Sequence, residues 1–106
     1  MSDLNLDLVK KERRERMRWF ILRALDVSRP SGAYVPVLLD AVHTVYRDAT
    51  ELEVKRELDY LADRELIKLQ IDATEQWFAE LARYGVDIVE YALPVEPGIA
   101  RPKFGS

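Results

Sequence analysis

The stretch Thr50-Glu-Leu-Glu-Val-Lys-Arg-Glu-Leu-Asp-Tyr-Leu-Ala-Asp-Arg-Glu-Leu-Ile67 decides the fold. Thr50 followed three residues later by Glu53 is a capping box, in which each partner satisfies an unpaired N–H group at a helix start. Apolar residues then recur at helical spacing and define one buried face: Val54, Leu58, Leu61 and Ala62. The stretch therefore predicts a capped helix over 51–64 that runs directly into a β-strand.

The residues that follow predict a two-stranded hairpin. Leu66-Ile-Lys-Leu-Gln-Ile71 alternates apolar and polar side chains, as a half-buried strand does. Asp72 to Gln76 is a polar turn, and Trp77-Phe-Ala-Glu-Leu81 returns as the second strand. A helix followed by such a hairpin is the core of a winged helix-turn-helix, with the hairpin over 66–81 as its wing.

Two more helices precede this core and a short one follows it. We expect helices near 6–27 and 36–46, separated by the turn sequence Arg29-Pro-Ser-Gly32, with Pro36 at the first helical position. A short helix near 84–93 follows, although Gly85 weakens it. The prediction is an α+β winged-helix domain over 1–93, with an N-terminal helical extension and a Pro-rich extended tail over 94–106.

The first helix is apolar on more than one side between residues 17 and 25. A helix of this kind must be covered on more than one face. One side can meet the core of the domain, and the other needs either the C-terminal segment or a second subunit. We favour a central core helix; the alternative is a homodimer seam at Trp19 and Phe20.

Composition narrows the functional classes. At 106 residues with 33% charged side chains and no cysteine, the chain is one soluble domain without disulfides. No apolar run is long enough to span a membrane, and no signal peptide is evident, so we expect a cytoplasmic protein. The net charge of −3 does not suggest nucleic acid. The most basic run, Lys10 to Arg18, is either an arm on nucleic acid or a solvated helix face.

Two signatures resemble a known pattern. Leu58-x-x-Leu61 followed by Leu66-Ile67 looks like the end of a winged-helix recognition helix. Gly85-x-Asp87 and the later Pro97-Gly-Ile-x-Arg101-Pro102 look like the C-terminus of a family of small winged-helix proteins from Mu-like phages and prophages.

This resemblance covers roughly residues 13–102 and implies a winged-helix fold and a phage or prophage origin, but no settled biochemical role. The chain departs from the family at Glu65, where relatives usually end the third helix with Gly, and at Ala82, which cannot cap the last helix. These departures leave local geometry open.

The third helix gives mixed signals about DNA. A DNA-binding surface would use Arg47, Thr50, Lys55, Arg56 and Lys68, with Lys55 and Arg56 as the sequence-specific contacts. Yet residues 50–65 carry six acids and three bases, the wing has no base, and we expect Arg56 to pair within its helix with Glu53 or Asp59.

The alternative is a protein-interaction module that does not bind DNA. Leu52 and Tyr60 are expected to face outward among acids and would form a small docking patch. Enzymatic chemistry is not expected, because the single histidine, His43, has no nucleophile beside it. No metal or cofactor site is apparent.

The sequence thus favours a small, non-enzymatic DNA-binding accessory or regulatory protein of phage type. The second hypothesis is an adaptor that docks a phage or host protein, as a homodimer built on the first helix.

Overall fold

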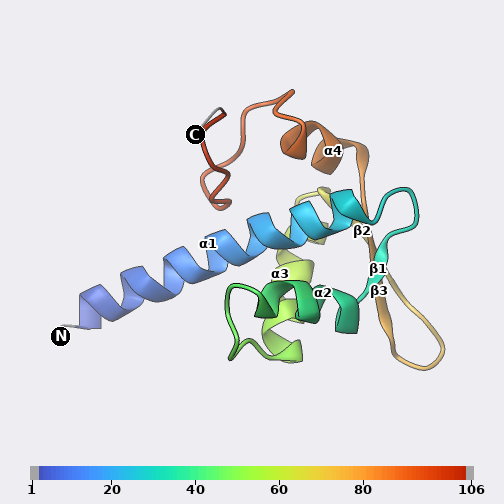
Figure 1. Ribbon diagram of the computed structural model, residues 1–106, viewed down its shortest axis with the longest axis horizontal. Coiled ribbons are helices and arrows are strands. Elements are labelled where there is room, and N and C mark those ends of the chain that lie inside the picture. Colours follow the sequence, from blue (N-terminus) through green and yellow to red (C-terminus); the bar gives the residue numbers. More distant parts are fainter. Residues whose placement is uncertain (1–2, 105–106) are drawn as a thin grey trace.

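The computed structural model describes residues 3–104, which form an α+β arrangement of four helices and a three-stranded antiparallel sheet (Figure 1). Its elements, in chain order, are α1 (Asp3–Val27), β1 (Ala33–Tyr34), α2 (Val35–His43), α3 (Glu51–Asp63), β2 (Ile67–Ile71), β3 (Trp77–Leu81) and α4 (Arg83–Val89). The expected α+β class and the hairpin are confirmed.

Helix α3 begins and buries its apolar face as the sequence predicts. The Thr50 hydroxyl accepts a hydrogen bond of 3.1 Å from the backbone N–H of Glu53. Val54, Leu58 and Leu61 are fully buried. Only half of the capping box forms, because the Glu53 carboxylate binds an arginine of α1 instead.

The end of α3 keeps a left-handed residue even though that residue is not glycine. Glu65 has φ 63°, and the N–H groups of Glu65 and Leu66 donate to the carbonyls of Ala62 and Leu61. These two bonds satisfy the last carbonyls of the helix and turn the chain into β2. The departure at Glu65 therefore changes the local energy of the helix end but not its geometry.

The sheet contains one strand more than the sequence predicted. Two residues, Ala33 and Tyr34, pair antiparallel with Ala79 and Phe78, which gives the strand order β1-β3-β2. Gly32 precedes β1 and has φ 83°. Glycine is required at this position because a Cβ would lie 2.5 Å from the carbonyl oxygen of Ala79. A strand of two residues has no periodicity to detect, so the sequence could not show it.

Helices α2 and α4 are shorter than expected. The prediction for α2 reached residue 46, but the helix ends at His43, and Tyr46 donates its N–H to Val42 in the turn that follows. The prediction for α4 reached residue 93, whereas the helix ends at Val89. As expected, Ala82 gives α4 no side-chain cap.

Helix α1 runs through the middle of the molecule, and its N-terminal half extends beyond the other elements (Figure 1). Its C-terminal half is buried on several faces, through Met17, Ile21, Leu22 and Leu25. The segment after α4 folds back over it: Ile99 is buried, and the Ala100 N–H donates to the carbonyl of Glu15. The prediction of a central core helix is thus confirmed.

Across residues 3–104, no helix combines the length and the apolar character that crossing a membrane requires.

Candidate functional site

The residues predicted to bind DNA fall into two places. Arg47, Thr50 and Arg56 lie at the N-terminal end of α3, and all three are exposed. Lys68 belongs to β2 and pairs in register with Glu80, on the sheet face away from the helices. The structure therefore brings part of the predicted set together and separates Lys68 from it.

A groove of about 440 Å³ lies between the N-terminal half of α1 and the start of α3. Its lining, in chain order, is Lys10, Arg13, Arg14, Asp48, Thr50, Leu52, Glu53, Arg56 and Glu57. Four of these nine residues are basic and three are acidic. Because the acids are near some of the bases, the free charge of the groove depends on which of them are paired.

Two arginines of α1 neutralise the acids. Arg13 donates to Glu53 at 2.7 Å and lies 3.0 Å from Asp48. Hydrogen bonding to Glu53 is the main cause that raises the pKa of Arg13 above its ordinary value. Arg18 donates to Glu57 at 2.8 Å, in a buried pair. Two carboxylates of α3 are thus satisfied from α1.

The other three cations of the groove have no acidic partner. Within residues 3–104, Lys10, Arg14 and Arg56 make no ion pair, and all three are exposed. The expectation that Arg56 pairs within its own helix was wrong, because Glu53 turns toward Arg13 and Asp59 lies outside salt-bridge distance. The groove therefore presents a cluster of unneutralised positive charge beside the N-terminus of α3.

Lys55 is occupied within the protein. Its Nζ lies 3.1 Å from Glu51 and 5.4 Å from the centre of the Trp77 ring, and its side chain is 28% exposed. These contacts tie α3 to the hairpin. A role in base recognition would require Lys55 to leave both partners.

Tyr60 does not point outward as predicted. Its ring lies between two guanidinium groups, those of Arg18 at 3.4 Å and Arg64 at 3.6 Å from the ring centre. Arg18 also donates to the carbonyl of Gly98, at 2.8 Å, and a Cβ on Gly98 would overlap the Tyr60 hydroxyl. The C-terminal segment thus covers Tyr60, which removes this residue from the predicted docking patch; Leu52 remains, 58% exposed.

The residues predicted for a dimer seam are also largely covered within one chain. Trp19 is 7% exposed and meets the Tyr91 ring edge-on at 6.1 Å. Phe20 is half-buried and lines a small pocket together with Ala100 and Pro102. The C-terminal segment therefore takes the place that a second subunit would have occupied at Trp19.

The tip of the wing is acidic. Asp72 and Glu75 lie there, and the turn from 72 to 76 carries no base. The Asp72 carboxylate accepts hydrogen bonds from the N–H groups of Thr74 and Gln76 and from the Thr74 hydroxyl. These hydrogen bonds lower the pKa of Asp72, the bond with the Thr74 side chain most of all. The wing is thus well ordered but unsuited to phosphate.

His43 makes a structural contact with the backbone. Its Nε2 lies 2.8 Å from the backbone carbonyl oxygen of Ala49, and this bond holds the turn between α2 and α3. In the part of the chain that the structure describes, no three His, Asp or Glu side chains come together as metal ligands.

The sequence did not identify Lys10 and Arg14 as partners of α3. The basic run from Lys10 to Arg18 was visible, but six bases on one helix point in several directions. Only the packing of α1 against α3 shows which of them pair with acids and which remain free.

Comparison with protein-family models and with curated proteins gives no match to this chain.

Proposed function

We propose that this protein is a small, non-enzymatic winged-helix protein of phage or prophage type that binds double-stranded DNA as an accessory or regulatory factor. The order helix, strand, helix, helix, strand, strand over α1 to β3, with the strands arranged β1-β3-β2, supports the winged-helix assignment. The phage origin rests on the resemblance of the C-terminal sequence alone.

The observation that carries the DNA proposal is the set of unpaired cations Lys10, Arg14 and Arg56 around the start of α3. In helix-turn-helix proteins, the N-terminal residues of the recognition helix contact base edges while a preceding helix meets the backbone. We infer that Arg56 of α3 contacts base edges and that Lys10 and Arg14, on α1 beside the start of α3, contact the backbone. Arg47 is also exposed, in the turn before α3.

The acidity of α3 is less of an obstacle than its sequence suggests. Glu53 and Glu57 are paired with arginines of α1, and Glu51 is paired with Lys55. The other exposed acids of α3 belong to the C-terminal half of the helix: Asp59, and Asp63, which lies 3.9 Å from Arg64. A duplex that approaches the N-terminal half would therefore meet positive charge first.

The salt dependence of duplex binding tests this proposal. Each phosphate contact contributes about −0.9 to the slope of log affinity against log salt, so replacing Lys10, Arg14 and Arg56 together by Ala should flatten the slope by up to about 2.7. Fluorescence anisotropy of a labelled random-sequence duplex between about 50 and 200 mM NaCl measures it.

The matched control replaces Lys68 and Arg23, which are also exposed bases but lie away from the groove. This double variant should keep the slope of the unmodified protein. Absence of duplex binding at low salt, or an equal loss in both variants, would reject the proposal.

A second candidate function is a protein-binding adaptor, and two observations favour it. The wing tip is acidic, and Leu52 is 58% exposed at the start of α3. If duplex binding is absent, the adaptor role replaces the DNA role, and Leu52→Glu should then weaken binding of the partner protein.

A further inference from the structure

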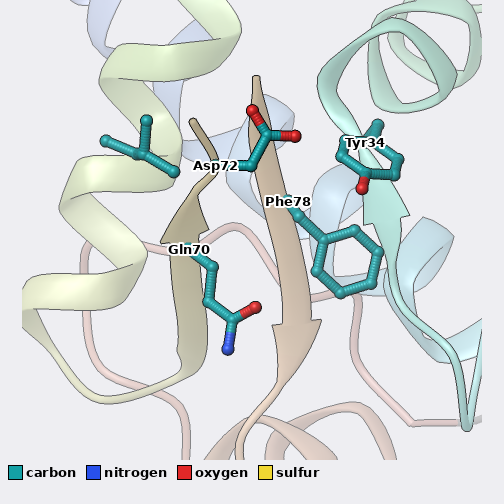
Figure 2. A pocket seen from close by; sticks show the side chains of 5 residues that line it. Tyr34, Gln70, Asp72 and Phe78 are labelled. Carbon is teal, nitrogen blue, oxygen red and sulfur yellow. The ribbon is translucent and has the colours of Figure 1, made fainter. Parts of the chain in front are cut away.

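A second hollow of the molecule lies on the outer face of the sheet, the face turned away from the helices. It has a volume of about 530 Å³ and is lined by Tyr34, Gln70, Ile71, Asp72 and Phe78 (Figure 2). Register pairing aligns Tyr34, Phe78 and Gln70 in one row across the three strands. Core-facing positions of the same strands, such as Ala33 and Ala79, are buried.

An aromatic pair forms one wall of this hollow. The rings of Tyr34 and Phe78 meet edge to face, with their centres 4.9 Å apart and their planes at 62°. The Phe78 ring packs against Gly32, because the tip of the ring fills the space that a Cβ on Gly32 would need. Tyr34 is 43% exposed, so part of an aromatic surface remains open to solvent in a fixed position.

A carboxylate stands at one end of the hollow. Figure 2 shows Asp72 beside the upper part of the sheet, with the Tyr34 and Phe78 rings on one side and the Gln70 amide on the other. Oδ1 of Asp72 accepts all three hydrogen bonds that its side chain makes in the wing turn. Its second oxygen, Oδ2, has no donor among residues 3–104 and is therefore available to a ligand.

These groups have the chemistry that binds a guanidinium. The faces of aromatic rings attract cations, a carboxylate accepts charge-assisted hydrogen bonds, and an amide carbonyl such as that of Gln70 accepts another. Planar guanidinium can stack on a ring while its N–H groups reach the carboxylate, which a compact ammonium does less well.

The charge around the hollow selects the class of partner. Asp72 and Glu80 lie on this side of the hairpin, Glu75 lies in the turn at its tip, and Lys68 is the one base that the register places among them. Three carboxylates repel the phosphates of a nucleic acid, although exposed rings on a sheet can also stack bases. A basic segment of a partner protein complements both the rings and the carboxylates.

We propose that the outer face of the sheet is a docking site for an arginine-containing segment of a partner protein. The arginine lies against Tyr34 and Phe78 and donates to Asp72. This site is on the opposite side of the sheet from α3. The protein can therefore hold DNA and the partner at the same time.

An NMR titration tests the proposal with a defined probe, the blocked dipeptide N-acetyl-Gly-Arg-amide. The amide signals of Tyr34, Gln70 and Asp72 should shift with a common saturating curve, and the analogue with citrulline in place of arginine should bind at least about fivefold more weakly, as expected when an ion pair is lost.

Two variants keep the fold and remove the site. Asp72→Asn retains the Oδ1 acceptor that the wing turn needs and removes the charge, and Tyr34→Ala removes a ring that makes no capping bond to α2. Each should weaken the dipeptide about fivefold or more. Asp59→Asn, which removes an exposed acid from α3, should leave the affinity unchanged.

Three results would overturn the proposal: equal binding of the arginine and citrulline probes, an equal effect of Asp59→Asn, or shifts at Tyr34 and Phe78 caused by a single-stranded oligonucleotide but not by the dipeptide. The outcome is separable from that of the DNA proposal. Loss of Lys10, Arg14 and Arg56 should not change dipeptide binding, and Asp72→Asn should not reduce duplex binding.

Discussion

The buried pair of Arg18 and Glu57 connects α1, α3 and the C-terminal segment, and its removal is predicted to destabilise all three. The side chains are 11% and 5% exposed. Arg18 gives one nitrogen to Glu57 and another to the carbonyl of Gly98, both at 2.8 Å, and its plane covers the ring of Tyr60.

Arg18→Met keeps much of the side-chain volume but leaves the Glu57 carboxylate buried without its partner. Breaking a buried pair in this way costs about 3–5 kcal/mol, against a total stability of roughly 5–15 kcal/mol for a domain of ordinary stability. Urea denaturation at neutral pH, followed by circular dichroism, should show a loss of this size. Amide exchange should also become faster at Ala100, whose N–H bonds to Glu15.

The double variant Arg18→Met/Glu57→Leu separates the pair from the packing. Because no charge remains buried, it should be more stable than Arg18→Met alone, with a coupling free energy of about 2 kcal/mol or more. A loss below about 1 kcal/mol in Arg18→Met, or additive effects in the double variant, would show that the pair does not hold the three segments together.

Three further predictions concern the backbone and the wing. Glu65→Gly should raise the free energy of unfolding by about 1 kcal/mol in urea denaturation, because Glu65 has φ 63°; an unchanged midpoint would contradict this. Gly85→Ala should lower it by more than about 1 kcal/mol although Ala favours helices, since the new Cβ would overlap the carbonyl oxygen of Leu66; a more stable variant would refute this. The pKa of Asp72 is lowered in the folded protein, so its contribution to the wing is present above the ordinary Asp pKa of about 3.9 and is lost as pH falls through the lower folded value. NMR titration of the Asp72 carboxyl carbon should place its midpoint below that of ordinary Asp, with the Thr74 amide following it, whereas an ordinary midpoint would count against the hydrogen-bonded turn.

Local patterns in the sequence were sufficient for the main elements. The periodicity of Val54, Leu58 and Leu61 identified the buried face of α3, and alternation over residues 66–81 identified the hairpin, because both signals lie within one element. Thr50 was correctly identified as the cap for the same reason. Element ends were less well predicted: α2 stops before Val45, an apolar residue that is 37% exposed.

The sequence alone could not predict which residues far apart in the chain contact each other. Arg56 was expected to pair within α3, but Arg13 lies 40 positions before Glu53 and takes its carboxylate, which leaves Arg56 free. Tyr60 was expected to be exposed because its helix position faces outward, yet a segment almost 40 residues later covers it. Whether a charged side chain is neutralised, and whether a side chain is exposed, depends on partners that no local pattern specifies.

Composition and periodicity by themselves determined an α+β chain with a capped third helix, a hairpin and an apolar first helix, because these features depend on propensity and on burial of one face. Only the tertiary structure decided where free charge remains. The packing of α1 on α3 pairs some bases and exposes others, and the pairing of a two-residue β1 with β3 creates an aromatic hollow from residues 44 positions apart. Both candidate surfaces result from these long-range contacts, whose energies depend on distance in space and not along the chain.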